Sequence, residues 1–178
     1  MKSKSKSRSR APASPTDGIS LLKKDHAEVR SLLNTLNKAA TDGEQRQRLL
    51  REIELSVQAH TTIEEEIFYP AFRETVRSDT NKKLYFEAIE EHHVVDLVMA
   101  ELKEPGVELE EFAAKAKVLK DLIEHHVEEE ETQMFPKARK AMGMDVLRDV
   151  GLRMEHRKQQ LIGGSPQGKV VKLTNRAA

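Results

Sequence analysis

The sequence contains no cysteine and no tryptophan, and aromatic residues make up only 4% of its 178 residues. Without cysteine, neither a disulfide framework nor a thiolate metal site can form, so imidazole and carboxylate groups must hold any transition metal. No apolar run approaches the roughly 20 residues of a transmembrane helix. The N-terminus has no hydrophobic stretch of the kind found in a secretory signal. These absences predict a cytoplasmic protein that does not associate with a membrane.

The charge is balanced in total but unevenly distributed along the chain. There are 30 basic and 30 acidic residues, yet residues 1–16 carry five basic side chains and no acidic one. We therefore predict a disordered basic tail over residues 1–16, one helical domain over 17–142, an extra C-terminal helix over 143–162 and a flexible tail over 163–178. The basic tail is the only part suited to a polyanion such as nucleic acid, through charge alone; a purely solubilising role is the simpler interpretation.

Four long stretches place apolar residues at alternating steps of three and four, which is typical of one face of an α-helix. The first runs from about residue 19 to 39, the second from just after Gly43 towards Pro70, the third from about 79 to Pro105-Gly106, and the fourth from about 108 towards Pro136. A shorter amphipathic stretch covers about 145–161. Strand signals are missing. The pattern predicts an all-α fold, an up-and-down antiparallel four-helix bundle with a short extra C-terminal helix.

The chain repeats itself at an offset of 66 residues. KDHAEVRSLLNTL, which contains His26, matches EEHHVVDLVMAEL, which contains His92. HTTIEEEIFYP, which begins at His60, matches HVEEEETQMFP, which begins at His126. Each half is therefore expected to be a helical hairpin with one histidine on its first helix and a His-x-x-x-Glu motif on its second. Two such hairpins would close into a bundle with approximate two-fold symmetry.

The repeated residues have the chemistry of a metal site. Residues four apart share one face of a helix, so His60 and Glu64 can face a common centre, as can His126 and Glu130. His26 and His92 fall on otherwise apolar stripes. Unpaired carboxylates buried among apolar residues are costly, so a cation is expected between them. Mixed imidazole and carboxylate ligation suits iron, and manganese and zinc accept the same donor types. The predicted ligands are His26, His60, Glu64, His92, His126 and Glu130.

Two other arrangements use neighbouring residues. A shifted register would replace His126 and Glu130 with His125 and Glu129, but alignment on the repeated proline favours the first pair. A ferritin-like di-iron site needs two Glu-x-x-His motifs. The sequence offers only Glu90 to His93, without a counterpart in the other half.

The order His, His-x-x-x-Glu, His, His-x-x-x-Glu, followed by EEEIFYP and EEETQMFP, resembles the hemerythrin-like (HHE cation-binding) family. The resemblance covers roughly residues 17–140. It implies an up-and-down four-helix bundle with two iron ions per chain joined by an oxo or hydroxo bridge. By that similarity His26 and His60 would bind one iron and His92 and His126 the other. Glu64 and Glu130 would bridge the two ions.

One departure from the oxygen-carrying members concerns the third helix, where those proteins place a second histidine one turn from the first. Here the positions one turn either side of His92 are Ala88 and Asp96. Asp96 could be a further carboxylate ligand or a solvated charge. If Asp96 does not bind, one coordination position of the metal is left for water, hydroxide, peroxide or another small ligand. Tyr85 could line the pocket around this open position, although a place in the apolar core is the simpler interpretation.

Three functions are compatible with these residues. The first is a di-iron protein that binds or senses dioxygen, nitric oxide or iron itself. The second is an enzyme that reacts with peroxide or dioxygen, similar to a catalase or peroxidase, at an open metal position. The third is an interaction module in which the metal stabilises the bundle and the basic tail binds a polyanion.

Overall fold

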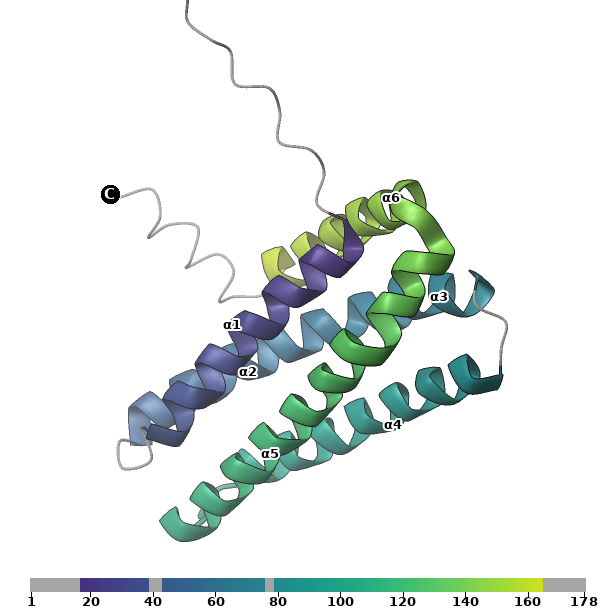
Figure 1. The fold of residues 1–178 in the computed structure, drawn as a ribbon. Coiled ribbons are helices and arrows are strands. Elements are labelled where there is room, and N and C mark those ends of the chain that lie inside the picture. The colour runs from purple at the N-terminus through teal and green to yellow at the C-terminus, as the bar shows by residue number, and fades with distance from the viewer. Residues whose placement is uncertain (1–16, 39–42, 76–78, 165–178) are drawn as a thin grey trace, which may run out of the picture.

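The computed structural model describes residues 17–38, 43–75 and 79–164, and these form helices joined by short connections, without a strand. The four long helices of the predicted bundle are α1 (Gly18–Lys38), α2 (Gly43–Ile63), α4 (Asp79–Leu102) and α5 (Leu109–Glu129). Figure 1 shows α1 beside α2 and α4 beside α5, and α1 also packs on α5. The predicted all-α bundle is confirmed. The predicted tail over residues 1–16, and residues 165–178 of the other, lie outside the described residues.

Local signals in the sequence account for where the helices begin and end. Asp17 precedes α1, and its carboxylate accepts hydrogen bonds from the Ser20 backbone N–H (3.2 Å) and the Ser20 hydroxyl (2.7 Å). This side-chain cap satisfies a backbone donor that the first turn leaves unpaired. Helix α4 ends at Leu102, just before Pro105, and Gly106 adopts a φ of 87° in the turn that leads to α5.

The two His-x-x-x-Glu motifs are each followed by a π-helical turn, η1 (Glu64–Phe68) and η2 (Glu130–Met134). In both turns the carbonyl oxygen of the glutamate accepts the backbone N–H five residues later, from Tyr69 and Phe135. The expectation that the second and fourth helices stop at Pro70 and Pro136 is wrong, because the chain remains helical through both. Each proline is the second residue after a π turn, at the start of a new α-helix, where a missing N–H is tolerated.

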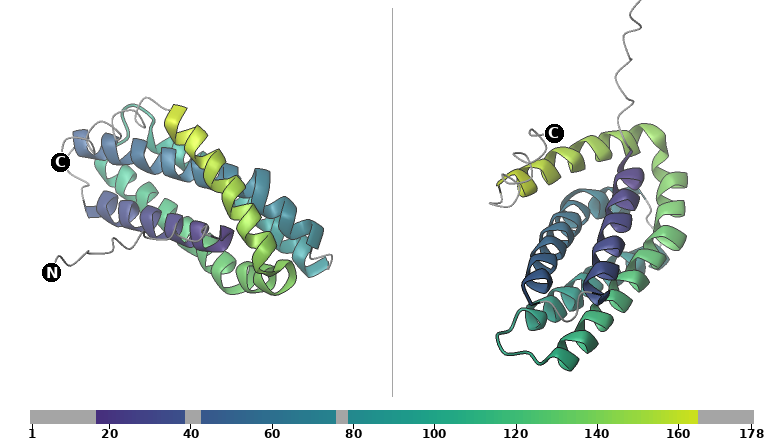
Figure 2. Two further views of the ribbon diagram at one scale, coloured as in Figure 1. Left: turned by 90° about the horizontal axis from the view of Figure 1, so that it is seen from above. Right: turned by 90° about the vertical axis from the view of Figure 1, so that its left-hand side faces the viewer.

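After η1 the chain continues as α3 (Tyr69–Thr75), and after η2 as α6 (Phe135–Gly164). Helix α6 is bent at Gly143, whose φ of 73° and ψ of 169° are not helical. The predicted C-terminal helix over residues 143–162 corresponds to the part of α6 after this bend. That part turns back over one end of the bundle and packs on α1, α2 and α3 (Figure 2).

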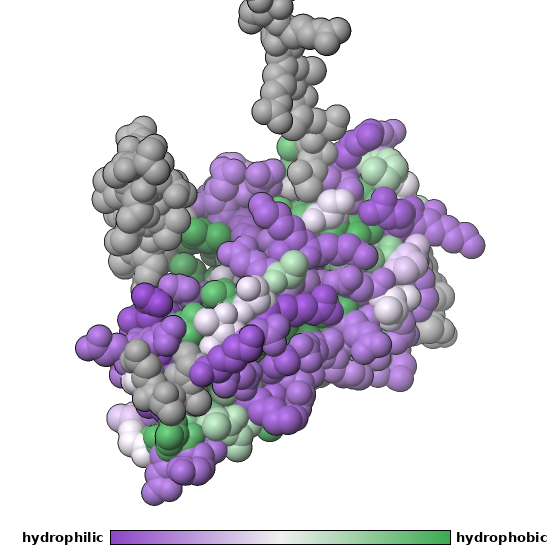
Figure 3. Space-filling model, turned by 60° about the vertical axis from the view of Figure 1, so that its left-hand side comes forward, coloured by the Kyte–Doolittle hydropathy of each residue, from purple (hydrophilic) through white to green (hydrophobic). Residues whose placement is uncertain are grey.

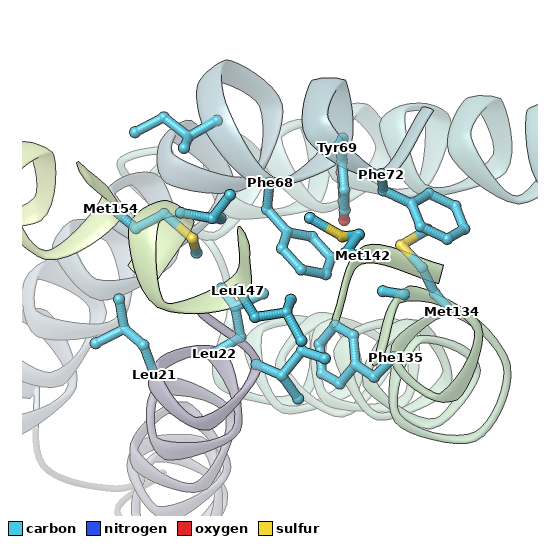
Figure 4. Packing of buried hydrophobic residues seen from close by; sticks show 14 of the residues in the cluster. Leu21, Leu22, Phe68, Tyr69, Phe72, Met134, Phe135, Met142, Leu147 and Met154 are labelled. Atoms are coloured by element: carbon cyan, nitrogen blue, oxygen red, sulfur yellow. The ribbon is translucent and has the colours of Figure 1, made fainter. Parts of the chain in front are cut away.

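The core consists of two apolar clusters that lie on either side of a polar layer. On α1, for example, Leu22 belongs to one cluster and Val29 to the other, with the buried His26 between them. Figure 4 shows part of the first cluster, where Phe68 and Phe135 meet beside Leu147 of α6. Each fully buried side chain of this kind contributes roughly 1.5–3 kcal/mol through the hydrophobic effect. The two clusters therefore fix the helices on both sides of the polar layer.

The outer surface is mainly polar. Hydrophilic side chains dominate the face in Figure 3, and the apolar areas there are small and scattered. None of the helices within the described ranges has the combination of length and apolar character that a membrane-spanning segment requires.

Candidate metal centre

The polar layer contains the six residues that the sequence analysis selected. Each lies on a different helical segment, and none exposes more than 6% of its surface. They are His26 on α1, His60 on α2, Glu64 at the start of η1, His92 on α4, His126 on α5 and Glu130 at the start of η2. Folding thus brings four imidazoles and two carboxylates together from all parts of the bundle.

These side chains form two overlapping groups in which one nitrogen or oxygen atom per residue lies within 4.8 Å of the others. One group consists of His26, His60, Glu64 and Glu130, and the other of Glu64, His92 and His126. The histidines are therefore divided into the same pairs that the family resemblance implied. The two groups have the carboxylate of Glu64 in common.

Each carboxylate lies between one histidine of the first pair and one of the second. The Glu64 oxygens are 3.2 Å from Nε2 of His60 and 3.4 Å from Nε2 of His92. Oε2 of Glu130 is 3.1 Å from Nε2 of His26 and 3.7 Å from Nε2 of His126. Each glutamate thus contacts one histidine of each pair.

An outer ring of carboxylates contacts the other nitrogen of the histidines. Glu131 lies 3.0 Å from Nδ1 of His26, and Glu65 lies 2.7 Å from Nδ1 of His92. Because carboxylate oxygens only accept hydrogen bonds, Nδ1 is the donor in each contact. The Nε2 atom of the neutral ring then keeps a free electron pair toward the centre, as a metal ligand requires.

The remaining two histidines have equivalent outer partners. Glu91 accepts a hydrogen bond from Nδ1 of His126 at 2.8 Å, and Asp25 lies 3.7 Å from Nδ1 of His60. All four outer carboxylates obey the 66-residue offset, Asp25 with Glu91 and Glu65 with Glu131. The sequence analysis selected none of these four carboxylates. Their position next to a predicted ligand in both halves was the signal that could have identified them.

Tyr69 is a further residue of the site that the sequence analysis did not select. Its buried hydroxyl donates a hydrogen bond to Oε1 of Glu130 (2.9 Å) and lies 3.4 Å from Nε2 of His92. The ring stacks on His92 with 5.8 Å between centroids, as the ring of Phe135 does on His26. Phe135 is the equivalent of Tyr69 in the second half. One oxygen atom therefore distinguishes the two halves beside the cluster.

Without a cation, the polar layer disfavours the charged forms of Glu64 and His60. Burial raises the pKa of the Glu64 carboxyl well above its usual range, and the Glu130 carboxylate adds to that shift. Burial also lowers the pKa of His60 to about 4, which leaves a neutral imidazole. Among the described residues, seven buried side-chain atoms lack a hydrogen-bond partner, and five of them are the Nε2 and carboxylate oxygen atoms of the predicted ligands. Metal ions would satisfy these atoms and compensate both carboxylates.

The structure does not bring Asp96 into the cluster. The buried stripe of α4 steps by three after His92, to Val95, and Asp96 lies a further 100° around the helix. It is exposed and lines a surface groove of about 360 Å³ between α2, α4 and the end of α6. Tyr85 is not part of the cluster either. Its ring packs edge-to-face on Tyr69 at 6.2 Å, so it contacts the site through that side chain.

The two competing arrangements do not fit the fold. Glu90 and His93, the residues of the single ferritin-like motif, are both exposed on α4. His125 is also exposed, and His125 and Glu129 lie on the outside of α5 rather than in the polar layer. The register with His126 and Glu130 is the one in which the side chains reach the interior.

Comparisons with known proteins agree with this geometry. The model of the hemerythrin HHE cation binding domain matches residues 17–138. An uncharacterised Mycobacterium tuberculosis protein, Rv2633c, is 28% identical over 148 residues, which are 80% of this chain and 86% of that protein. A DNA nickase from a Nostoc species is 24% identical over 151 residues. That match spans 83% of this chain but only 42% of the nickase.

A solved structure resembles this chain over most of its length. It is the crystal structure of a hemerythrin HHE cation binding domain-containing protein, the Rv2633c homolog from Mycobacterium kansasii. The TM-score is 0.69 and the identity 26%, and the match covers 84% of this chain and 89% of the other. The matched family model spans more than half of the chain and includes all six buried residues of the cluster. The chain belongs to the hemerythrin HHE cation binding domain family.

Proposed function

We propose that this protein holds two iron ions in the polar layer and uses them to bind or sense dioxygen, nitric oxide or iron itself. The observation that carries the proposal is a cavity of about 30 Å³ inside the bundle, lined by all four predicted histidine ligands and by aliphatic side chains such as Val29, Val57 and Ile123. A space of this size is about that of one water molecule. It therefore favours a diatomic or similarly small ligand over an organic substrate.

The residues of the chain have distinct tasks in this proposal. Four imidazoles and two carboxylates form the donor set, which suits iron and also fits manganese or zinc. Iron would supply redox chemistry and a Lewis acid. The outer carboxylates hold each imidazole ring in orientation through its Nδ1 atom. The two apolar clusters exclude bulk water from the cavity.

Metal analysis and visible spectroscopy of the purified protein test the proposal. We expect two irons per chain and charge-transfer absorption, and a reduced protein that binds dioxygen or nitric oxide reversibly. The variant His60→Ala should lose iron and absorption together. His93→Ala removes an exposed imidazole and is the matched control, because it should keep both. A wild-type protein that takes up no iron, or that has the same iron content after His60→Ala, would contradict the proposal.

A second candidate function is reaction with peroxide. It is favoured by Tyr69, because its hydroxyl lies between Glu130 and His92 and can hold a proton at the edge of the cluster. We expect Tyr69→Phe, loaded with saturating iron, to have a lower rate of hydrogen peroxide turnover per bound iron. Tyr85→Phe, which removes a phenol outside the cluster, should not lower it. If the wild-type protein does not consume peroxide, this candidate is excluded.

A third candidate is binding of nucleic acid by the basic residues 1–16, which lie outside the described residues. Its support is the likeness to a protein named DNA nickase, and it depends on charge alone. A variant that lacks residues 2–15 should lose salt-sensitive DNA binding. If the intact chain binds no DNA at low salt, this candidate is wrong.

A further inference from the structure

The two halves of the repeat differ in the group that compensates the negative charge of an outer carboxylate. In the first half, the Asp25 carboxylate accepts a hydrogen bond from the ammonium group of Lys158, on α6, at 2.6 Å. Burial opposes ionisation of Asp25, but the neighbouring His60 and Lys158 hold its pKa below the usual value. The equivalent residue in the second half is Glu91. Within the described parts of the chain, Glu91 has no lysine or arginine partner and contacts only His125 and His126 among charged groups.

In the second half, Glu91 belongs to a cluster of side chains of the types that bind metal ions. Glu91 of α4 and His125 and Glu129 of α5 each offer one nitrogen or oxygen atom, and the three atoms lie within 4.8 Å of one another. His125 and Glu129 are one turn apart on the same helix face. The His125 side chain is 66% exposed and that of Glu91 is 26% exposed, so the cluster is open to solvent.

The first half has no such cluster, because Ala59 and Ile63 occupy the positions equivalent to His125 and Glu129. Both are buried. These two positions are therefore apolar in the first half, where Lys158 supplies the positive charge. In the second half they carry side chains that can bind a metal ion. The contrast shows that the second cluster is not a requirement of the fold.

A small internal space connects this cluster with the interior. A cavity of about 10 Å³ is lined by Glu91 and Glu129 on the outside and by His126 and Glu130 on the inside. Glu130 is only 2% exposed, and its Oε2 atom has no hydrogen-bond partner among the described residues. Two residues of the outer cluster and two of the buried centre thus line the same cavity.

We propose that Glu91, His125 and Glu129 form a second, solvent-exposed site for a divalent metal ion, and that this site passes the ion to the buried centre. Two carboxylates and one imidazole suit ferrous iron, manganese and zinc. The two negative charges match a divalent ion, and solvent can fill the other coordination positions. The transfer role rests on the proposed function, whereas binding at the outer site does not.

Binding at the outer site is tested with Mn²⁺, followed through paramagnetic broadening of the His125 imidazole signals in NMR spectra of the full chain. The double variant His125→Ala/Glu129→Gln leaves every buried ligand in place. Glu91 is not varied, because it also contacts His126. Loss of even an outer partner typically weakens metal affinity about 10- to 100-fold, so the double variant should weaken Mn²⁺ binding at this site, measured by electron paramagnetic resonance, by at least about tenfold.

The control His93→Ala/Glu128→Gln removes an exposed imidazole and an exposed carboxylate from the same helices and should bind Mn²⁺ as the wild type does. The proposed outer site is wrong if Mn²⁺ does not broaden the His125 signals of the wild type. It is also wrong if the two double variants bind Mn²⁺ with equal affinity.

The transfer role is tested by the rate at which metal-free protein acquires ferrous iron. His125→Ala/Glu129→Gln should load several-fold more slowly than the wild type but reach the same final iron content, and the control variant should load at the wild-type rate. An unchanged rate overturns the transfer role. A failure of the proposed function is distinct, because it would appear as no iron in the buried centre while Mn²⁺ still broadens His125.

Discussion

Tyr69 and Phe135 occupy equivalent positions in the two halves, and the phenol oxygen makes only the first of them a partner of the cluster. Tyr69→Phe leaves Oε1 of Glu130 without its hydrogen-bond donor. We expect the loaded protein to release iron to a chelator more readily, with a loss of affinity of about 10- to 100-fold. Tyr85→Phe is the control, and equal resistance of wild type and Tyr69→Phe to the chelator would contradict the expected role.

Glu64 should have opposite effects on the metal-free and the loaded protein. Without metal, the Glu64 carboxyl is buried against Glu130, and its raised pKa means that folding at neutral pH must either protonate it or bury its charge; Glu64→Gln removes that cost. We expect the free energy of unfolding of the metal-free protein to rise by about 1 kcal/mol or more, while the same variant loses metal affinity. Urea unfolding with and without metal measures both effects. Glu128→Gln, at an exposed position, should change stability by less than about 0.5 kcal/mol in either state.

At the scale of single residues, much of the candidate site was predictable because the repeat marks each position twice. The six buried residues follow from the spacing of His and Glu, and the outer carboxylates follow the same offset. The location of Asp96 was harder to predict, because a residue one turn from His92 can lie on either side of the buried stripe. Only the packing of α4 against its neighbours decides this, and it places Asp96 in the groove.

At the scale of the helices, the apolar stripes and the break at Pro105-Gly106 predicted the four long helices. The continuation through Pro70 and Pro136 was not predictable from the usual helix-breaking effect of proline, because it depends on a π turn. The two π turns start at Glu64 and Glu130, one residue before the outer partners Glu65 and Glu131. The altered register is thus located where a central and an outer carboxylate approach the two nitrogens of one imidazole, that of His92 at the first turn and that of His26 at the second.

The bend in α6 gives a prediction for that helix. Gly143 has a φ of 73° and a ψ of 169°, a conformation that residues with a Cβ atom rarely adopt. We expect Gly143→Ala to lower the free energy of unfolding by about 1–3 kcal/mol, because the helix must turn there to pack on α1 and α2. Gly164→Ala, at the open end of the same helix, serves as the control in urea titrations. Equal midpoints for the two variants would show that the bend is not needed.

At the scale of the whole molecule, the polar layer divides the core, so the stability of the bundle should depend on metal. Binding to the folded state alone stabilises it by about 2.7 kcal/mol when the free metal is 100 times Kd. We expect Tm to rise with metal concentration and to fall after chelation, measured by circular dichroism. In His60→Ala/His126→Ala, one ligand of each pair is missing, and Tm should not respond to metal. A wild-type Tm that is the same with and without bound iron would refute this coupling.

The part of α6 after Gly143 has no counterpart within the repeat, and it carries a lysine that reaches the first half. Its Lys158 contacts the carboxylate behind His60, whereas Glu91 behind His126 has no lysine or arginine partner among the described residues. A carboxylate whose charge is compensated attracts the Nδ1 proton of the imidazole less strongly. His60 should therefore donate less electron density to its metal ion than His126 does. The iron ions of a duplicated site would then be spectroscopically different, with two separate Mössbauer doublets of equal area, and Lys158→Met should bring those doublets closer together.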